Sequence, residues 1–377
     1  MNICFLSTTH NPLDSRLFHR EACSLSKFHS IKIIAISQTG PIGNFNNVRF
    51  FPIPPPKHKI FHFITIFKVL FAGIACNADV YVCMEPGSLF SGVIIKKIKK
   101  KYLFYDGHEY FPELFADNTV FPQLIRPIVI KIMESIEKIL ARHADIVITV
   151  DPYLKERYLK YNDNVYIFPN YPILQVFTNE MANQSGNGLI YIGYLKLEKG
   201  LHQILQAAVQ SKTQITCVGP YASNFDRDKI EKFIKENPNL DITIVGNIRH
   251  AEVKRYISLS RIGMVLLQPV DRHLHVVPVK LFEYMACGKP VIASNFPDIS
   301  AIIKRERNGI TVNPVDVEEI TQAIKFLLHN PEEANKMGIN GRKAIEQYYN
   351  WERIEQEFIE LFSLFTTKYE EEQPSNY

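Results

Sequence analysis

The chain has 377 residues, 46% hydrophobic and 22% charged, which is typical of a globular protein long enough for two domains. Its net charge of +4 is much smaller than the positive charge typical of nucleic-acid-binding proteins, so no nucleic-acid partner is expected. None of the six cysteines lies in a C-x-x-C pair, which argues against a zinc site or a redox pair. Scattered cysteines and an N-terminus without a signal-peptide pattern favour a cytoplasmic protein.

The first half of the chain alternates short β-rich runs with helical patterns, which predicts a parallel sheet covered by helices on both faces. Helical stretches include Ser15–Lys27 and Leu124–Arg142. The expected strands are Ile3–Leu6, Ile31–Ile36, Val80–Cys83, Tyr102–Tyr105 and Ile146–Val150.

The segment Ile60–Ala78 is rich in Phe, Ile, Leu and Val, but His62, Lys68 and Asn77 interrupt it. Its length and its polar residues favour a buried core helix over a membrane span. A helix lying at a membrane interface is the alternative.

A turn-rich segment between Pro169 and Gly188 marks the predicted domain boundary. The alternation then restarts, and the chain ends in helices that include Trp351–Phe365, where apolar residues recur at helical spacing. The expected strands of the second half are Leu189–Ile192, Gln214–Val218, Ile242–Val245, Gly263–Leu267, Val291–Ala293 and Ile310–Val312.

These patterns predict an α/β protein of two doubly wound, Rossmann-like domains that face each other across a cleft. The predicted parts are an N-terminal domain over 1–175, a second domain over 188–350 and a last helical segment over 351–377 that returns to the first domain. Open α/β sheets bind ligands beyond the carboxyl ends of their strands. The chemistry is therefore expected on loops that follow strands.

The clearest motif is the run from Pro278 to Pro290, which begins with a residue suited to a first helical turn and ends at Gly288. Free N–H groups at such a helix start can meet a phosphate, and Lys280 adds a positive charge there. Glu283 lies on the same side one turn later, where a carboxylate can accept hydrogen bonds from a ribose diol. An ordinary solvated ion pair is the alternative.

Residues 278–294 resemble the donor-binding segment of family-4 glycosyltransferases, which have the GT-B fold. The resemblance implies that Glu283 holds the ribose of a nucleotide-sugar donor and that Leu281 belongs to the same donor-binding turn. That family's pattern has an earlier glutamate near the donor sugar, and His275 stands in its place here. A histidine can still hydrogen-bond a sugar hydroxyl, and a surface loop histidine is the alternative.

Residues 191–200 resemble the G-R-x4-K-G segment of the same family, whose two cations hold the donor diphosphate. Lys199 and Gly200 match this pattern, whereas Tyr194 occupies the arginine position, and Lys196 is the candidate that compensates from the same loop. Cations placed in advance stabilise the charge that develops on a departing diphosphate. A solvated lysine is the alternative for Lys199.

The first domain offers weaker candidates. His108, within the run from Asp106 to Glu109, corresponds to a histidine that lies near the reacting sugar in related enzymes, and Glu109 and Glu113 are candidate acceptor contacts. Arg16 follows a predicted helix cap at Asp14 or Ser15 and resembles the P-x-D-x-R start of some members. It is a candidate diphosphate or acceptor contact. Turn, capping and surface roles are the alternatives.

Two loops of the second domain follow strands and resemble the family's nucleobase pocket, with Gly246 allowing close approach and Ile248 packing on the base. The triplet Asp226-Arg227-Asp228 spells the D-x-D of metal-dependent glycosyltransferases, but its place at a helix start favours a dipole role, and no metal site is predicted. The basic run from Lys96 to Lys101 is most simply a solvated helix face. Contact with an anionic membrane is the alternative.

The resemblance implies a retaining glycosyltransferase that moves a hexose-type sugar from a nucleotide-diphosphate sugar to a saccharide or lipid-linked acceptor in surface polysaccharide synthesis. The nucleotide sugar is a co-substrate, and no cofactor is expected. His108, Lys199 and Glu283 are the expected catalytic residues. Two alternatives stay open: a sugar-nucleotide epimerase of the same architecture, and a non-catalytic subunit that binds nucleotide sugars.

Overall fold

The computed structural model describes all residues except 41–44, 46, 59–60, 119–121, 178–185 and 373–377. Contacts divide the chain into two compact units: unit 1 comprises residues 1–170 and 354–377, and unit 2 comprises residues 171–353. The sequence had placed these divisions at 175, 188 and 350. Part of the predicted linker, residues 178–185, lies outside the described residues.

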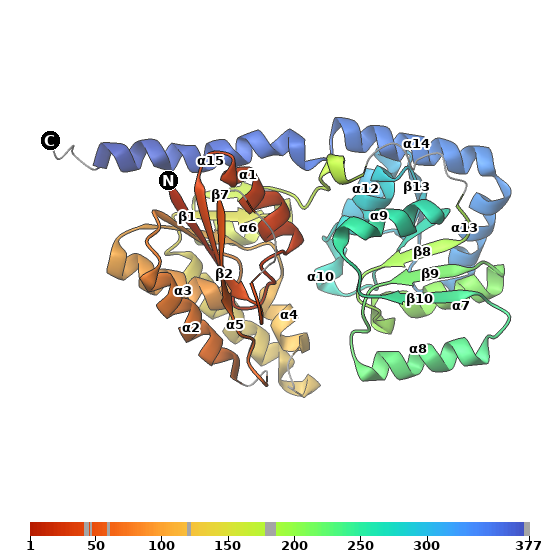
Figure 1. Ribbon diagram of the computed structural model, residues 1–377. Coiled ribbons are helices and arrows are strands. Elements are labelled where there is room, and N and C mark those ends of the chain that lie inside the picture. Colours follow the sequence, from red (N-terminus) through yellow and green to blue (C-terminus); the bar gives the residue numbers. More distant parts are fainter. Residues whose placement is uncertain (41–44, 46, 59–60, 119–121, 178–185, 373–377) are drawn as a thin grey trace. The chain divides into compact units, whose positions relative to one another are not determined.

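Unit 1 is built on a parallel sheet (Figure 1). Its seven strands lie in the order β3-β2-β1-β4-β5-β6-β7. All five predicted strands of this half are present. The sequence missed β3, whose Pro52 fits an edge strand because it cannot donate to a ladder, and the three-residue edge strand β7. The strands are β1 (Asn2–Leu6), β2 (Ser30–Ile36), β3 (Val48–Ile53), β4 (Val80–Cys83), β5 (Tyr102–Asp106), β6 (Ile146–Thr149) and β7 (Val165–Ile167).

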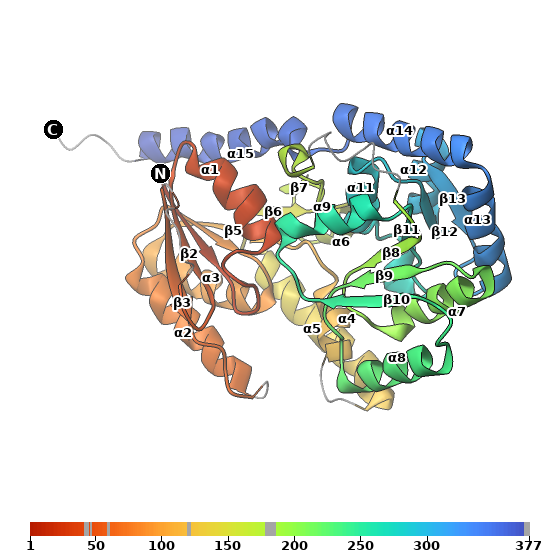
Figure 2. The same cartoon turned by 45° about the vertical axis from the view of Figure 1, so that its right-hand side comes forward.

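Helices cover both faces of this sheet. The strand order runs outward from β1 to β3 and then returns to β4, so right-handed crossovers place the later helices on the face opposite to the first ones. Helix α3 contacts both α2 and α5 on one face (Figure 2). The helices are the π-helix η1 (Ser15–Ala22), α1 (Cys23–Ser26), α2 (His62–Ala75), α3 (Pro86–Lys99), α4 (Phe111–Asn118), α5 (Arg126–Ala141) and α6 (Pro152–Leu159).

The last helix, α15 (Trp351–Glu372), packs on the other face of unit 1. The ring centroid of Phe362 lies 4.7 Å from that of Phe104 on β5, and Phe358 contacts Phe168 at 5.1 Å. Near the start of this helix, Glu355 accepts hydrogen bonds from Lys27 and Ser24. Apolar side chains that recur at helical spacing in this helix, such as Phe358 and Phe362, therefore pack against unit 1.

Helix α2 is present, but it is not the buried core helix that its composition predicted. Only Thr65, Val69, Leu70 and Gly73 are buried, because the helix is one layer deep and its outer side remains exposed. Over the residues that the structure describes, no helix is both long and apolar enough to cross a bilayer.

Unit 2 has a six-stranded parallel sheet in the order β10-β9-β8-β11-β12-β13. Each predicted strand of this half is present with ends within two residues. The strands are β8 (Leu189–Ile192), β9 (Ile215–Val218), β10 (Ile242–Gly246), β11 (Ile262–Val265), β12 (Val291–Ser294) and β13 (Gly309–Val312). The principal helices are α7 (Leu201–Ser211), α8 (Asn224–Glu236), α9 (His250–Leu259), α10 (Asp271–Leu274), α11 (Val279–Ala286), α12 (Pro297–Glu306), α13 (Val317–His329) and α14 (Pro331–Gln347).

Both sheets reverse their strand order beside their first strand, between β1 and β4 in unit 1 and between β8 and β11 in unit 2. At such a point the loops that follow adjacent strands diverge and leave a crevice beyond the strand ends. Each unit therefore has its natural ligand position at its own reversal point, and the polar side chains of interest gather there.

Candidate functional site

In unit 2, the loops after β8 and β9 approach each other closely through glycines. Gly193 and Gly219 have φ of +124° and +140°, a region that favours glycine. A Cβ on Gly219 would lie 2.2 Å from the carbonyl oxygen of Gly193, so no larger residue fits there. A Cβ on Gly193 would lie 3.5 Å from Nζ of Lys280, which places that ammonium group directly over the loop.

Lys280 lies in the first turn of α11, where Pro278 precedes the helix as its N-cap. Its Nζ is 4.0 Å from the centre of the Tyr191 ring. Burial, reinforced by repulsion from Lys199 and opposed by Glu283, lowers the pKa of Lys280 to about 7. A cation held in so poorly solvated a place is stabilised by any anion that binds beside it.

Glu283 follows Lys280 by one helical turn and is only 5% exposed. Because Lys199 and Glu283 both act on the charge of Lys280, the three side chains lie in one electrostatic neighbourhood at the carboxyl end of β8. The structure thus brings together the two lysines and the carboxylate that the sequence singled out.

Tyr284 holds this arrangement in place, and sequence reasoning missed it. Its hydroxyl accepts a hydrogen bond from the backbone N–H of Ile192 at 3.0 Å and lies 3.3 Å from the carbonyl of Ile190. The ring fits because Gly263 has no side chain: a Cβ there would lie 2.3 Å from it. Two features of the sequence could have indicated this role of Tyr284: it is a large aromatic residue next to Glu283, and Gly263 lies within a predicted strand.

The loop that carries Lys196 and Lys199 is anchored by Asp226. The backbone N–H of Leu197 donates to Asp226 at 3.1 Å, while Ser223 caps α8 by accepting from the N–H of Asp226. The D-x-D triplet therefore has a structural role in this loop. Tyr194, in the position of the family's arginine, is 63% exposed.

The remaining donor-site candidates differ in accessibility. Gly246 has φ of +75° with open space beside it, and Ile248 packs at the edge of the core. His275 lies 3.5 Å from Asp298 and is 40% exposed. Leu281 requires a correction: its side chain is fully buried in the core of unit 2, because it is on the side of α11 that faces the sheet.

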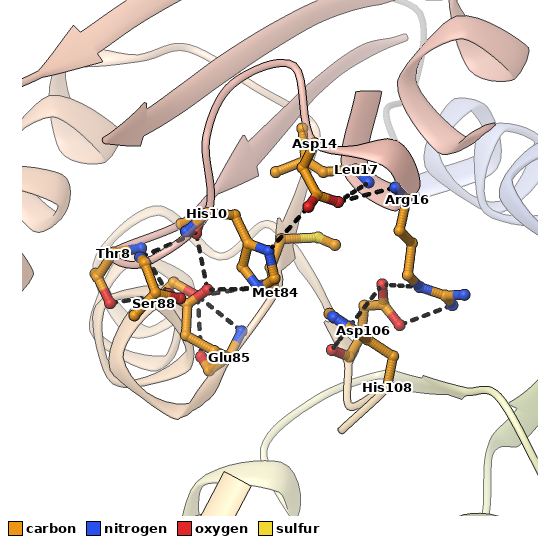
Figure 3. A network of polar contacts seen from close by, with 12 residues as sticks. Thr8, His10, Asp14, Arg16, Leu17, Met84, Glu85, Ser88, Asp106 and His108 are labelled. Atoms are coloured by element: carbon orange, nitrogen blue, oxygen red, sulfur yellow. Dashed lines mark hydrogen bonds and ion pairs between the residues drawn. The ribbon is translucent and has the colours of Figure 1, made fainter. Parts of the chain in front are cut away.

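In unit 1, Arg16 also requires a correction, because it is not available to a ligand. Only 2% of it is exposed, and its guanidinium donates two hydrogen bonds to Asp106, at 2.6 and 2.9 Å (Figure 3). It donates another to the carbonyl of Phe168. Glu21 lies 3.0 Å from the same guanidinium. Although burial opposes it, Arg16 and His108 hold the pKa of Asp106 well below its usual range. The helix cap that was predicted at Asp14 or Ser15 is Asp14.

Asp106 in turn fixes His108. Nδ1 of His108 lies 3.2 Å from the carbonyl oxygen and 3.3 Å from the carboxylate of Asp106. This anchors one ring nitrogen, so Nε2 is the nitrogen left to meet a ligand. Glu109 is exposed beside it, whereas Glu113 lies 3.9 Å from Arg157.

His10 was not predicted from the sequence, yet its ring centre lies 5.3 Å from that of His108 (Figure 3). Nδ1 lies 3.5 Å from Asp14 and Nε2 lies 4.0 Å from Glu85. Burial opposes protonation, but Asp14, Glu85 and Glu109 together raise the pKa of His10 to about 9. His10 is therefore an imidazolium at neutral pH, and its position after the first strand was the signal that could have found it.

Glu85 joins the two loops that diverge at the reversal point of unit 1. It follows β4, and it accepts hydrogen bonds from the N–H and hydroxyl of Thr8 at 2.6 and 2.9 Å (Figure 3). It accepts another from the hydroxyl of Ser7 at 2.8 Å. Ser7 and Thr8 follow β1. The carboxylate thus fixes the loop that presents His10.

We expect the His10→Gln variant to lose stability in a pH-dependent way. The folded-state pKa is about 9 against an ordinary value of 6.5, so the stabilisation is complete below pH 6.5 and is lost as pH rises through 9. The difference corresponds to about 3 kcal/mol. Urea melts of both proteins at pH 6 and above pH 9 measure it. His202→Gln, at an exposed position, is the control, and a deficit independent of pH would contradict the ion pairs.

The segment of unit 2 that carries this cluster matches a known sequence family. Residues 177–344 match the family described as Glycosyl transferases group 1. Two curated relatives are TuaH of Bacillus subtilis, provisionally named a teichuronic acid biosynthesis glycosyltransferase, and the O-antigen chain mannosyltransferase C of Escherichia coli. They are 29% and 21% identical over 45% and 47% of this chain. The matches span only 42% and 46% of those relatives.

Solved structures share the fold over nearly the whole chain. Sucrose-phosphate synthase from Thermosynechococcus elongatus has a TM-score of 0.78 at 20% identity, covering 97% of this chain and 99% of that one. The Anabaena protein HepE in complex with UDP-glucose has a TM-score of 0.73 at 15% identity, covering 96% and 99%. The predicted fold class, two Rossmann-like α/β domains of the GT-B type, is confirmed. The segment that carries Lys199, Lys280 and Glu283 therefore matches the group 1 glycosyl transferases and lies in a chain with the GT-B fold.

Proposed function

We propose that this protein is a glycosyltransferase that takes its sugar from a nucleotide-diphosphate sugar. The observation that carries the proposal is the cluster of Lys199, Lys280 and Glu283 at the reversal point of unit 2. A helix start with two lysines suits a diphosphate, and a carboxylate one turn along suits the hydroxyls of a ribose. The match of this segment to group 1 glycosyl transferases supports the same assignment.

In the proposed reaction, Lys199 and Lys280 stabilise the negative charge that develops on the departing diphosphate. Glu283 accepts hydrogen bonds from the ribose, and the loop with Gly246 and Ile248 receives the base. Lys196 supports the diphosphate, and His275 contacts the sugar. We propose retention of anomeric configuration by a front-face displacement, in which the leaving diphosphate helps to deprotonate the acceptor.

For the acceptor we propose a saccharide or a lipid-linked saccharide bound by unit 1. Its reversal point offers the His10 imidazolium, the anchored ring of His108 and the exposed Glu109, a set of hydrogen-bonding groups suited to hydroxyls. Glu113 lies at the start of α4 in the same unit. The names of the two curated relatives, which refer to teichuronic acid and O-antigen, support a role in surface polysaccharide synthesis.

The test is titration calorimetry of the whole chain with UDP-, GDP- and ADP-sugars at pH 8, in two buffers of different ionisation enthalpy. With a pKa of about 7, Lys280 is largely neutral at pH 8 and must gain a proton when a diphosphate binds beside it. We expect one nucleotide class to bind with uptake of about one proton. The Lys280→Met variant should lose that uptake, while Lys235→Met, at an exposed site, should keep it.

The outcomes separate the candidate functions. If none of the sugar nucleotides binds, the donor site is wrong, and binding without proton uptake contradicts the role of Lys280. Release of free nucleotide that depends on an added acceptor supports a transferase. Conversion of the sugar without nucleotide release would indicate the epimerase, and binding without any turnover would indicate the non-catalytic subunit.

A further inference from the structure

One face of unit 1 exposes large apolar side chains along the outer sides of α2, α3 and α5. These three helices form a continuous layer, because α3 contacts both of its neighbours. The exposed members of this outer face are Phe63, Ile64, Phe67, Phe71, Phe90, Ile98, Ile128, Ile132, Ile136 and Ile139. Contiguous apolar surface of this extent on a protein marks an interaction site.

The pattern on each helix shows that the exposure is organised rather than scattered. On α2, Phe63, Phe67 and Phe71 are 55%, 47% and 67% exposed and recur every four residues, so they form one stripe. Val69 and Leu70 of the same helix are buried toward the sheet. Helix α2 therefore has two apolar sides, of which folding uses only one.

Helix α5 repeats this arrangement. Ile128, Ile132 and Ile139 are 60%, 54% and 57% exposed, with Ile136 between them at 41%. Its buried side is formed by Glu137, Leu140 and Ala141 instead. Folding does not bury these four isoleucines, so they contribute little to the stability of the unit. Their alignment on one side of the helix indicates contact with an apolar partner outside the protein.

The charges on this face are mostly positive. Exposed lysines stand beside the apolar stripes, Lys68 on α2 and Lys131 and Lys138 on α5. On the same helices, Glu134 is partly exposed and Glu137 is buried against Tyr105. Long lysine side chains can lay their carbon stems on apolar surface while the ammonium reaches outward. A basic apolar face of this kind is typical of proteins that lie on membranes.

A basic hollow lies at the carboxyl ends of α3 and α5 and reaches Phe365 of α15, and Lys97, Lys100, Arg142 and His143 are among its lining residues. The structure divides the basic run seen in the sequence. Lys96 pairs with Asp145 at 2.7 Å, and Lys101 pairs with Asp79 at 3.3 Å. Lys97 and Lys100 are exposed and can meet an external anion.

We propose that this outer face of α2, α3 and α5, with its basic hollow, docks on the surface of an anionic lipid bilayer. The apolar stripes enter the boundary between headgroups and acyl chains, and the lysines and Arg142 meet lipid phosphates. A second copy of the chain fits less well, because a two-fold contact would bring the like charges of both copies together. The proposal is independent of the transfer reaction, although a lipid-linked acceptor would lie in the same membrane.

The test is co-sedimentation of the full chain with vesicles of phosphatidylcholine alone or mixed with phosphatidylglycerol. The wild-type protein should pellet with the mixed vesicles and be released at about 0.5 M KCl. The triple variant Phe63→Ser, Phe67→Ser, Phe71→Ser should bind at least tenfold more weakly. These positions are exposed, so the variant should keep its circular dichroism spectrum. The variant Lys97→Gln, Lys100→Gln, Arg142→Gln tests the hollow separately and should also bind more weakly.

The matched control is Phe225→Ser with Phe326→Ser, two exposed aromatic residues of unit 2, which should bind as the wild type does. The proposal is overturned if the wild-type protein stays in the supernatant with both kinds of vesicle. Equal binding to neutral vesicles, or unchanged binding of both unit 1 variants, would overturn it as well. A dimer in solution that the phenylalanine variant converts to monomer would assign the face to a second copy instead. None of these outcomes depends on sugar transfer.

Discussion

Replacing Glu283 with alanine is expected to lower kcat/KM about 100- to 1,000-fold, a loss of a few kcal/mol in transition-state stabilisation. The carboxylate is 5% exposed and one turn from Lys280, so its removal should free the ribose that we propose it holds while the diphosphate departs. Lys199→Ala should lower kcat to a similar extent. It removes a positive charge whose stabilising effect is largest when the bond between the sugar and the diphosphate breaks.

Steady-state kinetics with the donor that calorimetry identifies measure both effects. Glu231→Ala and Lys235→Ala, at exposed positions on α8, are the matched controls and should retain wild-type turnover. Since Lys199 and Lys280 influence each other, the effects of their substitutions should not be additive. Wild-type turnover in both Glu283→Ala and Lys199→Ala would contradict the donor site.

Arg16→Met is expected to destabilise unit 1 by about 3–5 kcal/mol, the usual cost of removing one partner from a buried ion pair. The guanidinium makes two hydrogen bonds to Asp106 and lies 3.0 Å from Glu21. Without it, both acids remain buried and lose the guanidinium that lies between them. Burial and the nearby Asp106 raise the pKa of Glu21 well above its usual range, which favours its neutral form, so the charge that loses its partner is mainly that of Asp106.

This loss is measured by urea denaturation, with unfolding monitored by far-ultraviolet circular dichroism. Arg49→Met, at an exposed position on β3, is the control and should change the unfolding free energy by less than about 0.5 kcal/mol. Adding Asp106→Asn to Arg16→Met should recover part of the stability, because it removes the uncompensated charge. A loss of less than about 1 kcal/mol for Arg16→Met would show that the ion pair is not essential.

Features that depend on neighbouring residues could be predicted from the sequence alone. Strands such as β4 and β8 were predicted with their observed ends, because each is a short apolar run between turn residues. Lys280 and Glu283 were correctly placed on one side of a helix by their spacing. The cap at Asp14 followed from the same local rules.

The tertiary structure decided everything that depends on residues far apart in the chain. Arg16 was predicted to contact a diphosphate or an acceptor, but the structure places it against Asp106, 90 residues away. The pKa of His10 is raised by Asp14, which is close in sequence, and also by Glu85, which only the reversal of strand order brings beside the first loop. The outer face of α2 is exposed because a single helical layer covers the sheet, and no local pattern states how many layers a fold will have. Burial and charge are properties of the assembled sheet, so these roles could not be assigned from neighbouring residues.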